Sequence, residues 1–172
     1  MSKSIFSRML ASGVAFLLSS MMFAENYVAV EKQAKIFDEP NVKGYVTLNT
    51  KNQEVSPIPG MIFKSLESNN GWQLVEYSPG LRGYLSDQFI GLPSRLPSEG
   101  TYTVANNRNL KLIAHRTENG WTAEVNGLKY NGQVVDNAVI FFNSDNLPAF
   151  SLVDFGQGVI AISYDNNSTG FF

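Results

Sequence analysis

The sequence has no cysteine and one histidine, and charged residues make up only 16% of its 172 residues. Without cysteine there can be no disulfide, thiolate nucleophile or lipid-bearing cysteine, and one imidazole cannot build a multi-histidine metal site. The formal charge of −2 gives no clustered basic surface for nucleic acid. These absences favour a binding protein over an enzyme, and we expect no metal, no cofactor and no nucleic-acid partner.

The first 24 residues differ from the rest of the chain. Lys3 and Arg8 precede an apolar run, and Ala24 supplies a small residue ahead of Glu25. This order is typical of a secretory signal peptide cleaved near Ala24. An N-terminal membrane anchor is the alternative, but the run is interrupted by serines and shorter than the ~20 apolar residues of a span. We therefore expect a periplasmic or secreted protein with no stable membrane span and no lipid anchor.

After Ala24 the chain carries 11 basic and 15 acidic groups, a formal charge of −4, and its pattern is that of an all-β protein. Short runs rich in Val, Ile, Tyr, Phe and Thr alternate with clusters of Asn, Gly and Pro, and helical spacing never persists. The expected strands are 27–30, 34–37, 43–48, 54–56, 61–66, 72–77, 82–85, 100–105, 110–115, 121–125, 128–130, 138–142, 149–153, 159–164 and 170–172.

A proline-containing segment separates two series of strands. Residues 91–100 read Gly-Leu-Pro-Ser-Arg-Leu-Pro-Ser-Glu-Gly, and prolines deny backbone donors and favour extended predecessors. We therefore expect a first small β-barrel over 25–92, a linker over 93–99, and a second small antiparallel β-barrel or sandwich over 100–172. The terminal Gly170-Phe-Phe172 is expected to close an edge strand, because two exposed phenylalanines would invite association.

The tripeptide Asn-Gly-Trp occurs twice, at Asn70–Trp72 and at Asn119–Trp121. Asn-Gly supplies the positive φ angles that a two-residue hairpin turn needs. We interpret both as hairpin turns followed by a packed tryptophan, with internal duplication as the alternative.

The first half resembles the bacterial SH3-like (SH3b) family over residues 34–90. The resemblance lies in an opening strand and proline turn, a glycine-led strand, a Gly-Trp pair and a later Gly-aromatic pair: 34–40 (AKIFDEP), 60–63 (GMIF), 70–75 (NGWQLV) and 83–89 (GYLSDQF). It implies an SH3-like small barrel that recognises a cell-wall ligand or a peptide. Ser65 and Tyr84 depart from the family pattern, in which an apolar residue and a tryptophan are usual.

Alternation along the expected strand 43–48 selects an exposed aromatic residue. A regular strand would direct Val46 and Leu48 inward, and Lys43, Tyr45 and Thr47 outward. Tyr45 is therefore the first candidate for ligand contact.

The expected strand 72–77 is apolar on both faces. Val75 and Tyr77 share one face, and Trp72 and Leu74 share the other. We expect the second half of the chain to cover the Trp72 face, because intrachain burial is the commoner reason for a two-sided strand, with a ligand groove as the alternative. The candidate ligand-binding residues are Tyr45, Trp72, Tyr77, Tyr84 and Arg82.

The second half contains no recognised motif. Asp136, Asp145, Asp154 and Asp165 lie mostly beside Asn or Gly, which favours turns. A Ca²⁺ loop at 165–169 and a catalytic role for His115 are weaker alternatives. The sequence thus predicts a non-catalytic exported binding module for an envelope peptide, glycan or protein. The alternatives are a structural or inhibitory envelope protein acting through a protein interface and, third, a hydrolase that uses paired carboxylates.

Overall fold

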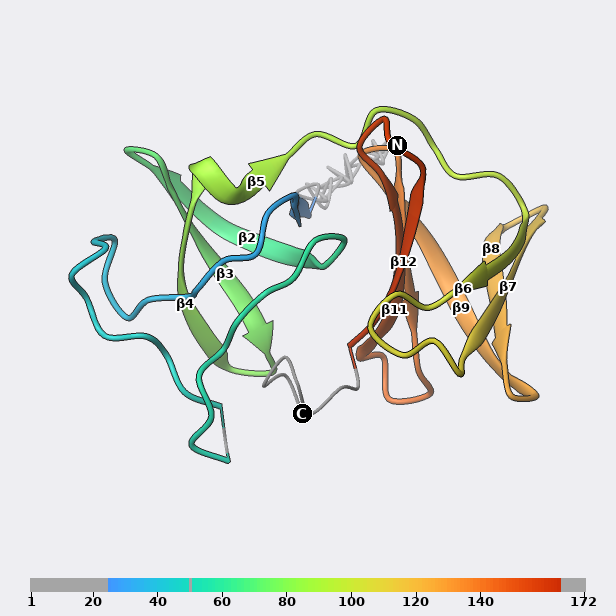
Figure 1. The fold of residues 1–172 in the computed structure, drawn as a ribbon, viewed down its shortest axis with the longest axis horizontal. Helices are drawn as coiled ribbons and strands as arrows, with labels where there is room; N and C mark the ends of the chain where they lie inside the picture. The colour runs from blue at the N-terminus through green and yellow to red at the C-terminus, as the bar shows by residue number, and fades with distance from the viewer. Residues whose placement is uncertain (1–24, 50, 165–172) are drawn as a thin grey trace, which may run out of the picture.

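The computed structural model describes residues 25–49 and 51–164, which form two antiparallel β-sheets and one short 3₁₀ turn (Figure 1). The all-β prediction is confirmed, with two barrel-like units as expected. The expected signal peptide, the aspartate-containing segment 165–169 and the expected strand 170–172 lie outside the described residues.

The first sheet is a half-barrel with the strand order β4-β3-β2-β1-β5. Its strands are β1 (Asn26–Val30), β2 (Ile62–Asn69), β3 (Trp72–Ser78), β4 (Leu81–Ser86) and β5 (Ile90–Gly91), and the 3₁₀ turn η1 (Asp87–Phe89) joins β4 to β5. The long connection between β1 and β2 forms isolated bridges instead of the three strands expected at 34–37, 43–48 and 54–56.

Side chains in this connection bind nearby backbone groups and compete with regular strand pairing. Asn49 Oδ1 accepts hydrogen bonds from the N–H groups of Lys51 and Gln53, and Asp38 Oδ1 accepts one from the Tyr45 N–H. The alternation expected over 43–48 therefore fails at Leu48, which is 47% exposed.

The second sheet has seven strands in the order β12-β11-β10-β9-β8-β7-β6. Its strands are β6 (Gly100–Thr103), β7 (Lys111–Thr117), β8 (Gly120–Val125), β9 (Leu128–Val135), β10 (Ala138–Phe142), β11 (Pro148–Asp154) and β12 (Val159–Ser163). A parallel bridge between Val104 and Ala161 brings its two edges together and nearly closes a barrel. Trp121, Phe141 and Leu152 belong to the core that fills it.

The two Asn-Gly-Trp segments form different turns. Asn70 and Gly71 both have positive φ, and Asn69 pairs with Trp72, as a two-residue hairpin requires. In the second segment Thr117 pairs with Gly120. Gly120 is therefore the first residue of β8, and the turn consists of Glu118 and Asn119. The first turn confirms the prediction, whereas the second is shifted by one residue along the chain.

A second buried cluster, called the shared core below, lies between the two sheets. β11 and β12 face the half-barrel (Figure 1), and side chains of β10, β11 and β12 belong to one buried cluster with side chains of β1, β2 and β3. Tyr164 Oη donates to the Ile62 carbonyl oxygen at 2.8 Å and accepts from the Ile62 N–H at 2.6 Å. Ser151 Oγ donates to the Gly60 carbonyl oxygen at 2.6 Å. Burial raises the pKa of Tyr164, which is consistent with a neutral hydroxyl holding the sheets together.

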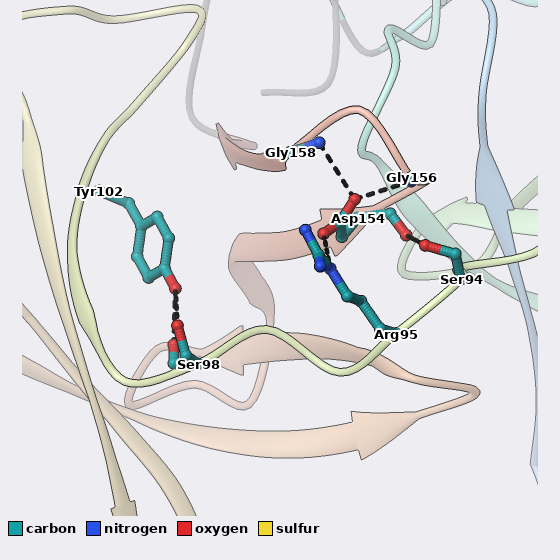
Figure 2. Close-up of polar contacts among 7 residues, drawn as sticks. All are labelled: Ser94, Arg95, Ser98, Tyr102, Asp154, Gly156 and Gly158. Carbon is teal, nitrogen blue, oxygen red and sulfur yellow. Dashed lines mark hydrogen bonds and ion pairs between the residues drawn. The ribbon is translucent and has the colours of Figure 1, made fainter.

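The connection from β5 to β6 is fastened to the second sheet (Figure 2). Arg95 Nε donates to the buried carboxylate of Asp154, and the Gly156 and Gly158 N–H groups donate to the other oxygen of that carboxylate. The Ser94 N–H donates to the Asp154 carbonyl oxygen at 2.7 Å. The hydrogen bond from Arg95 and the one from Gly156 lower the pKa of Asp154. Because its prolines are also buried, this connection is a packed strap.

Candidate functional site

A groove of about 230 Å³ lies on the outer face of the half-barrel. Two aromatic rings, a proline and a leucine supply its apolar surface, and one carboxylate and two amides supply its polar surface. Its described lining residues are Pro40, Glu67, Asn69, Asn70, Trp72, Leu74 and Tyr84.

Paired strands set the positions of the apolar side chains. Leu74 on β3 lies opposite Tyr84 on β4. Phe37 extends this row, because its N–H donates to the Tyr84 carbonyl oxygen at 2.9 Å and its carbonyl oxygen accepts from the Tyr84 N–H at 2.7 Å. The Phe37 ring meets Trp72 edge to face, with centroids 6.0 Å apart. The groove is thus built on a backbone ladder and an aromatic pair.

A glycine permits this close approach. A Cβ atom at Gly83 would lie 2.4 Å from Ile36 Cγ2 and 2.9 Å from the Phe37 carbonyl oxygen. Any larger residue at position 83 would clash with segment 36–37, which pairs with β4 beside the groove.

Gln73 ties together the elements beside Trp72. Its Nε2 donates to Ser68 Oγ and to the Asp87 carboxylate, both at 2.9 Å, and its Oε1 accepts from Ser65 Oγ at 2.8 Å. The Asp87 N–H donates to the Gly71 carbonyl oxygen at 2.9 Å. These bonds connect β2, the hairpin turn and η1. Among the described lining residues of the groove, Glu67 is the charged side chain.

The structure brings only some of the predicted site residues together. Trp72 and Tyr84 line the groove. Tyr45 is 84% exposed, as its predicted outward position requires, but it is not among the described lining residues. Arg82 is exposed on β4, where its backbone lies opposite that of Glu76 on β3, and it is not among the described lining residues. Tyr77 is only 8% exposed and lies in the shared core.

The prediction that the second half covers the Trp72 and Leu74 face is wrong. Val75 and Tyr77 belong to the buried cluster that includes residues of β10, β11 and β12, whereas the described lining of the Trp72 groove comes only from the first half. The reason is that Trp72 packs on Phe37 of its own unit, and the concave side of the half-barrel receives the second sheet.

Sequence reasoning missed Phe37, Pro40 and Glu67 as site residues. Phe37 and Pro40 belong to a connection whose path is set by its contact with β4. Glu67 faces Leu74 because of an irregularity in the pairing of β2 with β3. The Gly83-Tyr84 pair and the proline turn were the sequence signals for this part of the groove, but neither shows which side chains of the β1–β2 connection contact β4.

The three described aspartates of the second half that sequence analysis singled out lie in different surroundings. Asp136 and Asp145 are exposed in turns, and Asp154 is engaged by Arg95. His115 is exposed on β7. In residues 25–49 and 51–164 no three His, Cys, Asp or Glu side chains are placed to hold a metal ion. Nor does this part of the chain contain a helix long and apolar enough to cross a membrane.

Comparison of the chain with models of protein families, with curated proteins and with solved structures finds no match. The SH3b resemblance of residues 34–90 therefore stays a prediction, and the site is interpreted from its own geometry.

Proposed function

We propose that this protein is an exported, non-catalytic binding module that recognises a cell-envelope ligand, namely a wall peptide, a glycan or a protein. The observation that carries the proposal is the groove of Trp72, Leu74 and Tyr84 on the face turned away from the shared core. Aromatic faces beside a few polar groups are typical of sites for extended peptides and sugars.

The size and charge of the groove narrow the ligand class. Its volume of about 230 Å³ lies below the ~300 Å³ of a typical small-molecule pocket, so it suits one or two side chains or a sugar ring of a longer ligand. Glu67 places one carboxylate beside the aromatic rings. We therefore propose a ligand that combines an apolar or aromatic-stacking part with a cation or a hydrogen-bond donor.

Two alternatives receive less support. A structural or inhibitory role through a protein interface needs a contiguous flat apolar face. Val42, Tyr45 and Leu48 are exposed on the β1–β2 connection, whereas Leu92 is exposed on the strap and Leu128 on β9. A carboxylate hydrolase needs an acid with a raised pKa, whereas the pKa of Asp154 is lowered, mainly by its hydrogen bond from Arg95.

Export is part of the proposal and has its own test. β1 begins at Asn26, directly after the expected cleavage near Ala24. N-terminal sequencing of the protein recovered from the periplasm or the medium should start close to Glu25. A product that still begins at Met1 would overturn cleavage.

The binding test uses immobilised protein of residues 25–172, exposed to peptidoglycan and to a detergent extract of the envelope. Trp72→Ala should weaken retention of the captured ligand by about tenfold or more, because a central aromatic anchor carries a large share of binding energy. Glu67→Gln should weaken a cationic ligand selectively and raise the salt tolerance of what remains.

Leu128→Ala is the matched control, because Leu128 is 64% exposed on the second sheet. Circular dichroism of each variant checks that the fold is intact. Absence of any retained ligand, or equal retention by folded Trp72→Ala and Leu128→Ala proteins, would contradict the proposal.

A further inference from the structure

A second cavity, of about 280 Å³, lies where the two sheets meet. The first unit contributes β1, β2, the end of β3 and the β3–β4 turn, and the second contributes β10, the β10–β11 turn, the start of β11 and Tyr164. Its described lining residues are Glu25, Tyr27, Ile62, Phe63, Lys64, Glu76, Tyr77, Ser78, Pro79, Ile140, Phe142, Asn146, Leu147, Pro148 and Tyr164.

The cavity is apolar and aromatic within and charged at one margin. Phe63 packs edge to face on Tyr164, with ring centroids 6.4 Å apart. At the margin Lys64 Nζ lies 2.5 Å from a Glu25 carboxylate oxygen, and Tyr27 Oη donates to the other oxygen at 2.8 Å. Burial and this hydrogen bond raise the pKa of Tyr27 to about 12, so its hydroxyl stays a donor. Such a cavity suits an aromatic side chain carried on a polar segment.

The chain itself supplies such a segment at this place. Tyr164 lines the cavity and is fixed by its two hydrogen bonds to Ile62. The residues that follow it are Asp165-Asn-Asn-Ser-Thr-Gly-Phe-Phe172, a polar stretch, a glycine and two phenylalanines. Fully extended, these eight residues span at most about 26–29 Å, so the phenylalanines can fold back to the cavity from which the segment departs.

We propose that residues 165–172 bind to the cavity between the sheets, with Phe171 and Phe172 as the aromatic anchors and 165–169 as the tether. Covalent attachment at the cavity wall gives the phenylalanines an effective concentration of about millimolar or more. An unattached ligand of similar chemistry must exceed that concentration to compete. This interaction is independent of the Trp72 groove, which lies on another face and has a different lining.

The absence of cysteine makes a direct cross-linking test possible, because engineered residues are then the only thiols in the chain. Ser78→Cys places a thiol in the cavity lining, and Thr169→Cys places one beside the proposed anchors. In the double variant of the 25–172 protein, mild oxidation should give an intramolecular disulfide, measured by non-reducing electrophoresis and mass spectrometry.

The matched control pairs Thr169→Cys with Ser144→Cys, because Ser144 is exposed in the β10–β11 turn but lies outside the cavity lining. The cavity pair should cross-link about tenfold faster than the control pair, as a locally raised effective concentration predicts. Adding Phe171→Ala and Phe172→Ala should remove that difference.

Equal rates for the two pairs would overturn the proposal. So would a preference that survives loss of both phenylalanines, since the tether alone would then explain it. Slow cross-linking together with a molecule that co-purifies in native mass spectrometry would also overturn it, and would assign the cavity to an external ligand.

Discussion

At the scale of single residues, Asp154 joins the strap to the second sheet with a charge as well as hydrogen bonds. Its carboxylate receives Arg95 on one oxygen and two glycine N–H groups on the other. These donors stabilise the ionised form, which is why the pKa of Asp154 is lowered, and they make folding stability depend on pH in a definite direction.

Asp154→Asn should lower the free energy of unfolding at neutral pH. A lowered folded-state pKa contributes stability above the unfolded-state value of about 3.9 and loses it as pH falls through the folded-state pKa. The difference between the original protein and the variant should therefore be constant near neutrality and shrink below about pH 4.

Urea unfolding across the acidic and neutral range measures this difference. Asp145→Asn is the control, because it removes the same charge from an exposed turn. A difference for Asp154→Asn that is unchanged or larger in acid would show that the carboxylate charge does not stabilise the strap.

At the scale of elements, the contact of the β1–β2 connection with β12 depends on one glycine. Gly60 has φ +95°, and a Cβ atom there would lie 2.8 Å from Ile162 Cγ1 and 3.0 Å from Ile160 Cγ2. Ser151 also donates to the Gly60 carbonyl oxygen. At Gly60 the β1–β2 connection therefore lies so close to β12 that a side chain there would clash with it.

Gly60→Ala should destabilise the protein through both backbone strain and a clash with β12. Gly80→Ala is a matched control, since Gly80 has φ +75° but no atoms within 4 Å of a built Cβ. We expect Gly60→Ala to cost about 1–3 kcal/mol more than Gly80→Ala, the usual range for overpacking. Urea unfolding of both variants measures the difference, and equal losses would show that β12 moves aside without cost.

The strands of the second sheet and the three-stranded core of the first were predictable from sequence because each combines alternating or continuous apolar residues with Asn or Gly turns. The segment 34–56 was not, because Asp38 and Asn49 bind local backbone groups. Trp72 and Tyr84 were predicted as candidates and both line the groove, but their neighbour Phe37 depends on a contact across 47 positions of sequence. The sequence likewise showed that β3 has two apolar faces, whereas Ile162 and Tyr164 decide which one is buried.

At the scale of the whole molecule, we expect the two sheets to unfold as one unit, because they share a buried cluster. The buried cluster contains Val75 from the first sheet and Ile140 and Ile162 from the second. Separate unfolding of either sheet would expose these apolar side chains to water, which opposes it.

The two tryptophans test this directly, since Trp72 lies in the first sheet and Trp121 in the second. In Trp121→Phe the fluorescence reports the first sheet, and in Trp72→Phe it reports the second. Within each variant, the urea transition followed by fluorescence should coincide with that followed by far-UV circular dichroism, as two-state unfolding requires. A fluorescence transition that precedes the dichroism in either variant would show that one sheet unfolds alone.

The first and the last described residues of the chain lie at the same cavity between the sheets. Glu25 and Tyr164 line the same cavity, together with Ser78 at the end of β3, whereas Trp72 begins that strand on the groove side. At about 3.3 Å per residue, the two ends of this strand lie roughly 20 Å apart. A carrier protein or a surface attached at either end would therefore hold the molecule by one side and leave the Trp72 groove facing outward.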